Sequence, residues 1–119
     1  MAGKRRGYGR LEVRRGEVVT VVLPGAYGKP RSALIIQSDF FEALGSVTVL
    51  PITSELRGAP LLRIPVDPTD GNGLRKKSQV MIDKTQTVPR DKIGSTIGRL
   101  HSDTLVEVDR ALATFLGIG

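Results

Sequence analysis

Residues 28–39 read Gly-Lys-Pro-Arg-Ser-Ala-Leu-Ile-Ile-Gln-Ser-Asp, a basic loop that runs directly into an apolar segment. The loop half, Gly28 to Arg31, offers cationic side chains and backbone N–H donors to an anion. The continuous apolar run from Ala33 to Ile36 is typical of a buried strand bounded by turn signals. The sequence therefore predicts a rigid strand that carries Arg31 at its start.

Further strands are predicted on both sides of this one. Residues 17–23 are rich in β-branched side chains and stop at Pro24-Gly25, so they form an antiparallel pair with the segment that begins at Arg31. Later strands are expected over residues 46–52, 61–66, 78–88 and, as a brief or irregular edge, 91–100. Because Pro51 lacks an N–H, its end of the third strand is expected at a sheet edge or strand terminus.

Two helical segments complete the pattern. Residues 40–44 can form one turn capped by Ser38 or Asp39. A terminal helix with one apolar face is predicted, capped by Ser102 or Asp103 and closed by Gly117; its apolar positions are Leu105, Val108, Leu112, Phe115 and Leu116. Residues 14–119 are thus expected to form a single, mostly β, α+β domain: a small antiparallel barrel or curled sheet with short helices and a C-terminal helix.

Composition excludes several classes of site. The chain of 119 residues has no cysteine and one histidine, so it has no disulfide, no thiolate zinc site and no pair of catalytic histidines. No apolar run approaches the roughly 20 residues of a membrane span, and the basic N-terminus lacks an apolar signal core. We expect a soluble, cytoplasmic protein that needs no cofactor.

The positive charge is concentrated at the N-terminus. Of the net charge of +6, residues 1–16 carry +5, and residues 1–13 are expected to be a flexible basic arm. A polyanion such as nucleic acid is the functional interpretation, because neutralised phosphates release counterions. A solvated or expression-related tail explains residues 1–10 equally well.

Familiar ligand motifs are absent or incomplete. Residues 25–29 lack P-loop spacing and are followed by proline, and the turn-rich residues 67–73 put Pro68 where a calcium loop needs its first carboxylate. No Gly-x-Ser-x-Gly elbow occurs, and His101 is expected to be a surface or capping residue. Polar side chains at strand ends remain: Arg31, Thr53, Ser54, Gln79 and Asp83. If the strand ends converge, they offer a planar cation, hydroxyls and a carboxylate to a phosphate; otherwise Arg31 pairs with a surface acid and Thr53 merely ends a strand.

Over residues 14–118 the sequence resembles the MazF/PemK family of type II toxin–antitoxin toxins. The resemblance rests on the order and spacing of five motifs: Arg15-Gly16-Glu17-Val18, Gly28-Lys29-Pro30-Arg31, Leu50-Pro51-Ile52-Thr53-Ser54, Ser78-Gln79-Val80 with Asp83 and Thr87, and a helix ending Leu116-Gly117. It implies an SH3-like barrel, a homodimer, and metal-independent, sequence-selective cleavage of single-stranded RNA, chiefly messenger RNA. It also implies inhibition by a cognate antitoxin with an acidic, flexible tail.

The resemblance assigns roles by position. Arg31 and Thr53 match the catalytic arginine and threonine, and Asp83 matches an acidic catalytic position of the PemK-like branch. Expected substrate contacts are Tyr27, Gly28, Lys29, Ser54, Arg75, Lys76, Lys77 and Gln79. Two departures stand out: Ser32 replaces a common second proline, and Met81 replaces a catalytic arginine of the PemK-like branch. The weight therefore falls on the pair Arg31 and Thr53.

The implied reaction is attack by the RNA 2′-hydroxyl on the adjacent phosphorus, which leaves a 2′,3′-cyclic phosphate and a 5′-hydroxyl. Arg31 would stabilise the phosphorane oxygens and Thr53 would orient the phosphate, while Asp83 or His101 would serve as the base. Two alternatives are a toxin of the same fold that inhibits DNA gyrase without catalysis and a basic RNA-binding module.

Overall fold

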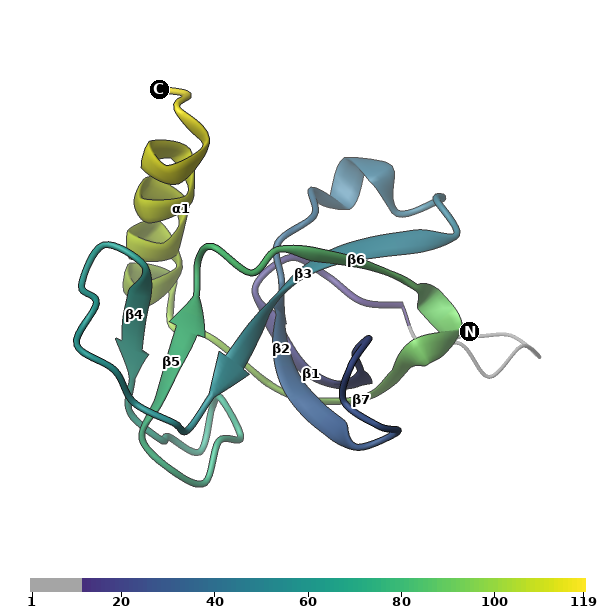
Figure 1. The fold of residues 1–119 in the computed structure, drawn as a ribbon. Coiled ribbons are helices and arrows are strands. Elements are labelled where there is room, and N and C mark those ends of the chain that lie inside the picture. Colours follow the sequence, from purple (N-terminus) through teal and green to yellow (C-terminus); the bar gives the residue numbers. More distant parts are fainter. Residues whose placement is uncertain (1–11) are drawn as a thin grey trace.

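The computed structural model describes residues 12–119, which form seven strands followed by one α-helix (Figure 1). Of the predicted basic arm, residues 1–11 lie outside the described residues, whereas Val13 is buried in the core. The strands are β1 (Glu17–Val22), β2 (Pro30–Ile35), β3 (Ser46–Thr53), β4 (Arg63–Val66), β5 (Ser78–Met81), β6 (Gln86–Pro89) and β7 (Ile93–Arg99). Two 3-10 turns, η1 (Asp39–Phe41) and η2 (Arg90–Lys92), precede β3 and β7, and the helix α1 spans Ser102–Leu116.

All seven strands belong to one antiparallel sheet. Its order is β4-β5-β3-β2-β1-β7, and β6 pairs with the first half of β3. Within residues 12–119 the edge strands β4 and β7 do not pair with each other, so the sheet is curled without closing into a barrel. The expected mostly-β fold with a C-terminal helix is confirmed.

Strand β3 changes its partner halfway along, and this corrects two predictions. One edge of β3 pairs Val49 with Gln86 of β6 and then Ile52 with Val80 of β5. Residues 50–51 separate these positions on β3, whereas residues 81–85 separate them on the facing segment, so the single strand predicted over 78–88 is two strands joined by a turn. Pro51 lies inside the sheet, because its missing N–H falls where that edge has no partner.

The curl gives the same strands two buried faces. Even-numbered residues of β1–β3 belong to one apolar cluster with β4, β5 and the helix: Val18, Leu34, Leu50 and Ile52. Odd-numbered residues belong to a second cluster with β6: Val19, Val21, Ala33, Ile35, Val47 and Val49. Because side chains alternate between the faces of a strand, burial on both faces explains the continuous apolar runs.

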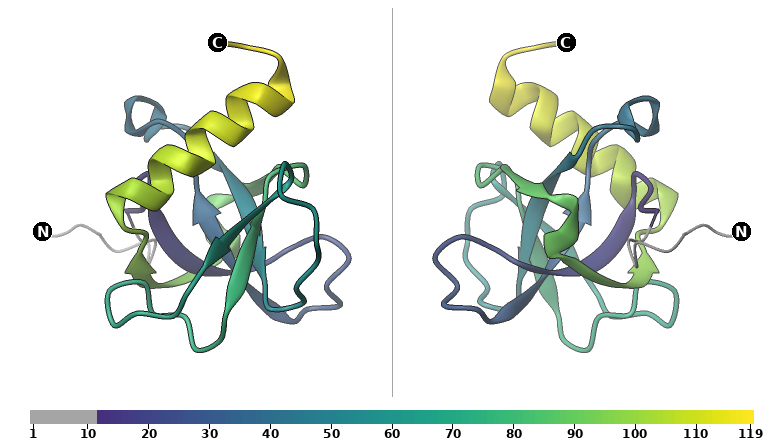
Figure 2. Two further views of the ribbon diagram at one scale, coloured as in Figure 1. Left: turned by 90° about the vertical axis from the view of Figure 1, so that its left-hand side faces the viewer. Right: turned by 90° about the vertical axis from the view of Figure 1, so that its right-hand side faces the viewer.

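Helix α1 lies obliquely across the outside of the curled sheet (Figure 2). Val108 is fully buried, and Leu105, Ala111 and Leu112 pack on the first cluster. The helix ends at Gly117, as predicted, with a φ of 74°. Its cap is His101, whose Nδ1 accepts the N–H of Asp103 at 3.1 Å, so the predicted cap at Ser102 or Asp103 is wrong. Within residues 12–119 no helix is long and apolar enough to cross a membrane.

Candidate functional site

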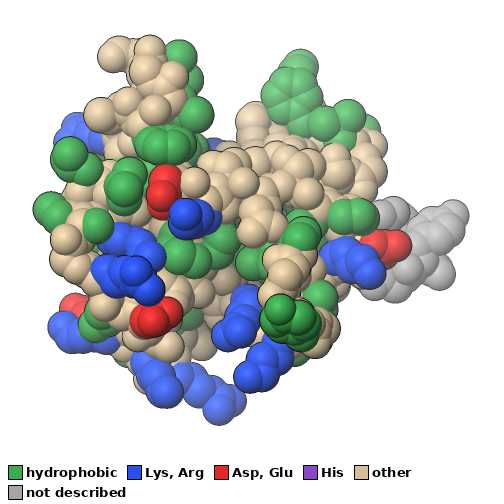
Figure 3. Space-filling view, in the orientation of Figure 1, with side chains coloured by type: hydrophobic (Ala, Val, Ile, Leu, Met, Phe, Trp, Pro, Cys, Tyr) green, Lys and Arg blue, Asp and Glu red, His purple; other side chains and the backbone are tan. Residues whose placement is uncertain are grey.

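An open hollow of about 800 Å³ lies where β2 begins and β3 ends. The loops after β1, β3 and β4 reach the same side of the sheet, the lower side in Figure 1. They supply part of the lining, together with strand residues that include Arg31 and Thr53. Figure 3 shows lysine and arginine side chains gathered around a depression over the lower part of this face. The hollow is therefore a surface site with a positive rim.

Arg31 and Thr53 lie side by side on neighbouring strands. The ladder between β2 and β3 ends with Ser32 opposite Ile52, and one further step places Arg31 opposite Thr53. Residues directly opposite in an antiparallel pair have Cβ atoms roughly 5 Å apart and share one face of the sheet. The two residues predicted as a catalytic pair are therefore brought together by the strand register.

The side chains of this pair are open to a ligand. Arg31 is exposed, and within residues 12–119 its guanidinium has no hydrogen bond or ion pair. The half-buried Thr53 accepts the main-chain N–H of Glu55 at its Oγ1, at 3.0 Å, which leaves its hydroxyl proton to donate. A planar cation and a hydroxyl donor thus face the same hollow, and Ser54 adds a second, exposed hydroxyl.

The loop between β1 and β2 forms one wall. Hydrogen bonds from Ala26 N to Leu23 O (3.1 Å) and from Lys29 N to Ala26 O (3.0 Å) make two successive turns. The first half of the loop and Pro30 line the hollow, whereas residues 27–29 form the exposed tip beyond it. Tyr27 adopts the left-handed conformation with a φ of 53° and holds its ring out in solvent. The predicted contacts at Tyr27, Gly28 and Lys29 are consequently at the rim.

The opposite wall is the loop between β4 and β5, which Asn72 organises. The buried Asn72 accepts the N–H groups of Thr69 (3.1 Å) and Leu74 (2.9 Å) and donates to the carbonyl of Asp67 at 2.9 Å. Its closed loop presents Arg75 and Lys76 to the hollow. Lys77 instead forms an ion pair with Asp67 at 3.2 Å, outside the lining.

Three further residues singled out from the sequence do not line the hollow. Asp83 lies in the turn after β5 and pairs with Lys84 at 3.6 Å. His101 is engaged as the cap of α1. Gln79, opposite Thr53 on β5, uses its amide to hold main-chain atoms of Arg57. Met81 does line the hollow, and it brings no charge to it.

Two charged residues of the hollow were missed from the sequence. Lys84 adds a fourth cation to Arg31, Arg75 and Lys76, and Glu55 is the single carboxylate among the described lining residues. Glu55 follows Thr53 by two positions, and its N–H donates to that threonine. In the sequence, the position of Glu55 two residues beyond a strand end could have marked it as a candidate for the site. The direction in which the following loop turns cannot be read from the sequence.

The chemistry available here is that of a phosphate site. Four cations, the hydroxyls of Thr53 and Ser54 and one carboxylate suit a phosphodiester and a proton transfer. Within residues 12–119 no three histidine, aspartate or glutamate side chains gather as metal ligands.

Comparisons with known proteins agree on one family. The model of the family described as "PemK-like, MazF-like toxin of type II toxin-antitoxin system" matches residues 14–116. A probable endoribonuclease MazF of Mycolicibacterium smegmatis is 51% identical over 89% of this chain and 98% of its own length. The endoribonuclease MazF3 of Mycobacterium tuberculosis is 39% identical over 75% of this chain and 81% of its own length.

Solved structures share the fold. The Mycobacterium tuberculosis toxin MazF-mt6 superimposes with a TM-score of 0.74 at 30% identity, covering 87% of this chain and 98% of its own. A mycobacterial endoribonuclease solved in complex with its cognate antitoxin has a TM-score of 0.77 at 24% identity, covering 90% and 97% of the two chains. At 24% identity, the similarity to this second structure shows a common fold only.

Proposed function

Because the chain belongs to the PemK-like, MazF-like toxin family of type II toxin–antitoxin systems, we propose that it is an endoribonuclease that cleaves single-stranded RNA, chiefly messenger RNA. The observation that carries the proposal is that Arg31 and Thr53 line the same basic hollow, each one residue beyond the last paired position of β2 and β3. The similar proteins named as endoribonucleases give further support. None of these comparisons favours gyrase inhibition.

The proposed reaction needs no protein nucleophile. The RNA 2′-oxygen attacks the adjacent phosphorus, the bond from phosphorus to the 5′-oxygen breaks, and the products are a 2′,3′-cyclic phosphate and a 5′-hydroxyl. Arg31 binds the non-bridging oxygens as negative charge builds up on them, and the Thr53 hydroxyl donates to one of them. No metal ion is required, because a guanidinium supplies the positive charge.

The 2′-hydroxyl must lose a proton during this attack. Of the two bases considered from the sequence, neither Asp83 nor His101 lines the hollow. We assign this proton to Glu55, whose exposed carboxylate is the one described acid on the hollow. The departing 5′-oxygen takes its proton from solvent, so atoms and charges balance.

Binding of the RNA would depend mainly on its phosphates. Arg75, Lys76 and Lys84 line the hollow, and Lys29 lies at its rim, which places cations along the path of a backbone. The chain has only five aromatic residues, and among residues 12–119 Tyr27 is the one at this rim, so stacking contributes little. Selectivity for unpaired strands would follow from loops that read splayed bases.

The family also suggests partners. We propose that the protein acts in the cytoplasm as a homodimer and is inhibited by a cognate antitoxin with an acidic, flexible tail. Negative side chains of such a tail would be attracted to the same positive rim as the RNA phosphates. Competition between the two polyanions would then inhibit the toxin without a conformational change.

One experiment tests the nuclease directly. Purified protein is incubated with single-stranded RNA in EDTA, and the cleaved positions and end groups are mapped. We expect cyclic phosphate and 5′-hydroxyl ends, and no cleavage at a site whose 5′-side nucleotide is changed to the 2′-deoxy form. Intact RNA, or cleavage that survives the 2′-deoxy change, would contradict the proposal. Inhibition of gyrase with intact RNA would favour the non-catalytic alternative.

A further inference from the structure

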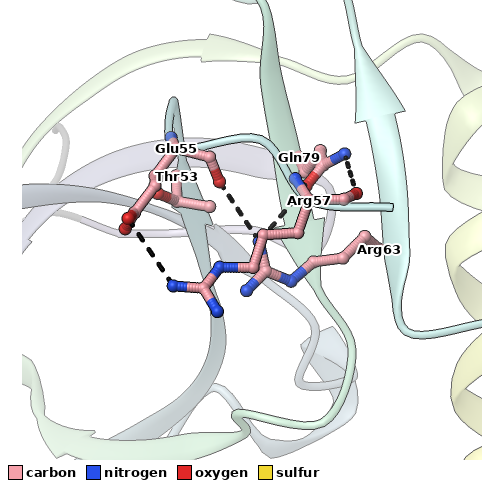
Figure 4. Close-up of polar contacts among 5 residues, drawn as sticks. All are labelled: Thr53, Glu55, Arg57, Arg63 and Gln79. Carbon is pink, nitrogen blue, oxygen red and sulfur yellow. Dashed lines mark hydrogen bonds and ion pairs between the residues drawn. The ribbon is translucent and has the colours of Figure 1, made fainter. Parts of the chain in front are cut away.

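The last residue of β3 and the four residues that follow it, Thr53 to Arg57, are held by side chains from two other strands; we call this segment the post-β3 loop. Gln79 on β5 accepts the N–H of Arg57 at 3.1 Å with its Oε1 and donates from Nε2 to the carbonyl of the same residue at 2.9 Å. Figure 4 shows this amide facing the main chain of the loop. The loop is therefore fastened to β5 at its far end.

Arg63 on β4 ties the middle of the loop to the same amide. Its Nη1 donates to the carbonyl of Glu55 at 3.3 Å and to Oε1 of Gln79 at 3.2 Å (Figure 4). Both main-chain polar groups of Glu55 are thus occupied, since its N–H donates to Thr53. Its carboxylate pairs with Arg57 at 3.5 Å through one oxygen, Oε2.

The bonding capacity of Gln79 is nearly filled by these contacts. A glutamine amide has two acceptor positions and two donors. Oε1 accepts from Arg57 and from Arg63, and Nε2 uses one of its two protons on the loop. One donor remains, so Gln79 has little to offer a substrate without releasing the loop.

The hold on this loop acts on two groups of the site. Thr53 lies opposite Gln79 in the ladder of β3 and β5, and Glu55 sits between the two fastened points. Both line the hollow, whereas Gln79 does not. When groups that must align with a phosphodiester are displaced slightly, the rate of cleavage falls much more than the affinity for the substrate.

We propose that Gln79, assisted by Arg63, is a positioning residue for RNA cleavage: it holds the post-β3 loop so that Thr53 and Glu55 face the scissile phosphate. The inference rests on the proposed function and replaces the substrate contact expected for Gln79 from the sequence. It predicts that the amide acts on kcat through the loop and has little effect on the affinity for RNA.

The test compares Gln79→Ala, Gln79→Glu and a control, Thr87→Ala. The control removes another side-chain hydrogen bond to β3, the 2.9 Å contact with Thr48 on the exposed face away from the hollow. In Gln79→Ala we expect kcat to fall about 10- to 100-fold, with KM changed by less than about twofold. Gln79→Glu keeps the acceptor for Arg57 and Arg63 and should lose less activity, and the control should match the wild type.

Amide hydrogen exchange gives a readout that does not depend on cleavage. In Gln79→Ala the N–H of Arg57 should exchange about two- to tenfold faster, while strand amides keep their protection. A further variant, Gln79→Ala in a Thr53→Val background, should lose less than the product of the two single losses, since the part of the Gln79 effect that acts through the Thr53 hydroxyl is already gone and only the part that acts through Glu55 remains.

Three results would contradict the proposed role of Gln79. Unchanged exchange of the Arg57 N–H in Gln79→Ala would show that Gln79 does not hold the post-β3 loop. Faster exchange together with a normal kcat would show that this hold has no role in catalysis. A raised KM with Gln79→Glu worse than Gln79→Ala would restore Gln79 as a phosphate or base contact, because an added carboxylate repels RNA. If the wild type fails to cleave RNA, the proposed function fails and the positioning role fails with it. The exchange data still decide whether Gln79 holds the post-β3 loop.

Discussion

Strands β2 and β3 each have a buried part and a part that is open to solvent at the hollow. Over Ala33–Ile35 and Val47–Ile52 nearly every side chain is buried, because both faces of the sheet are covered. One or two residues further, Arg31 is exposed and Thr53 is half-buried at the hollow. The strand middle supplies rigidity, and the strand end, carried on the same hydrogen-bond ladder, supplies chemistry. Stability and activity should therefore respond to different residues of the same strands.

The largest effect is expected in the strand middle. Leu50 is fully buried in the first cluster, and Leu50→Ala should lower the free energy of unfolding by about 2–5 kcal/mol through lost burial and a cavity. Chemical denaturation measures this loss. Thr53→Val, three residues along the same strand, is the matched control and should change stability by less than about 1 kcal/mol. Equal losses in the two variants would remove the contrast between the strand regions.

Arg31→Ala should show the opposite pattern. We expect kcat/KM for RNA cleavage to fall about 10²- to 10³-fold, an effect of roughly 3–4 kcal/mol on the transition state, as for the loss of an oxyanion donor. The free energy of unfolding should change by less than about 0.5 kcal/mol, because the side chain is exposed and has no described partner. Arg31→Lys keeps the charge without the planar fork and should recover only part of the activity. A destabilised Arg31→Ala would assign the residue to the structure.

His101 extends the comparison to a polar residue away from the hollow. His101→Ala removes the cap of α1 and should cost about 1 kcal/mol of stability, with no effect on cleavage. Thermal unfolding measured next to Ser102→Ala separates the observed cap from the one expected from the sequence. A rate loss in His101→Ala without a loss of stability would return the histidine to the reaction.

The smallest effect is expected at the rim. Lys76→Ala should reduce the salt dependence of RNA binding by about one charge, almost uniformly across sequences, as measured on uncleavable 2′-deoxy strands. Lys77→Ala is the neighbouring control, because Lys77 is paired with Asp67 outside the hollow. Identical slopes for both variants would mean that the RNA does not follow this wall.

Much of the fold could be predicted because its signals are local. β-branched runs and turn residues marked β1 to β3, and the helical spacing with Gly117 marked α1. The break of the predicted strand over 78–88 could not be read locally, since each half is a good strand and only pairing with β3 separates them. A surface or capping role was expected for His101, and the capping role is confirmed, but the cap was assigned to Ser102 or Asp103 because serine and aspartate, the usual caps, follow the histidine directly.

For the site, the sequence by itself determined which residues bring charge and hydroxyl groups to strand ends, foremost Arg31 and Thr53, because strand propensity and turn chemistry are written in neighbouring residues. Tertiary structure alone decided which of these ends meet. The register of β2 on β3 brings Arg31 next to Thr53, the turn after β5 carries Asp83 away from the hollow, and the hydrogen bonds from Gln79 to Arg57 hold the loop that contains Glu55. These choices depend on pairing between segments distant along the chain, and no local pattern encodes a register.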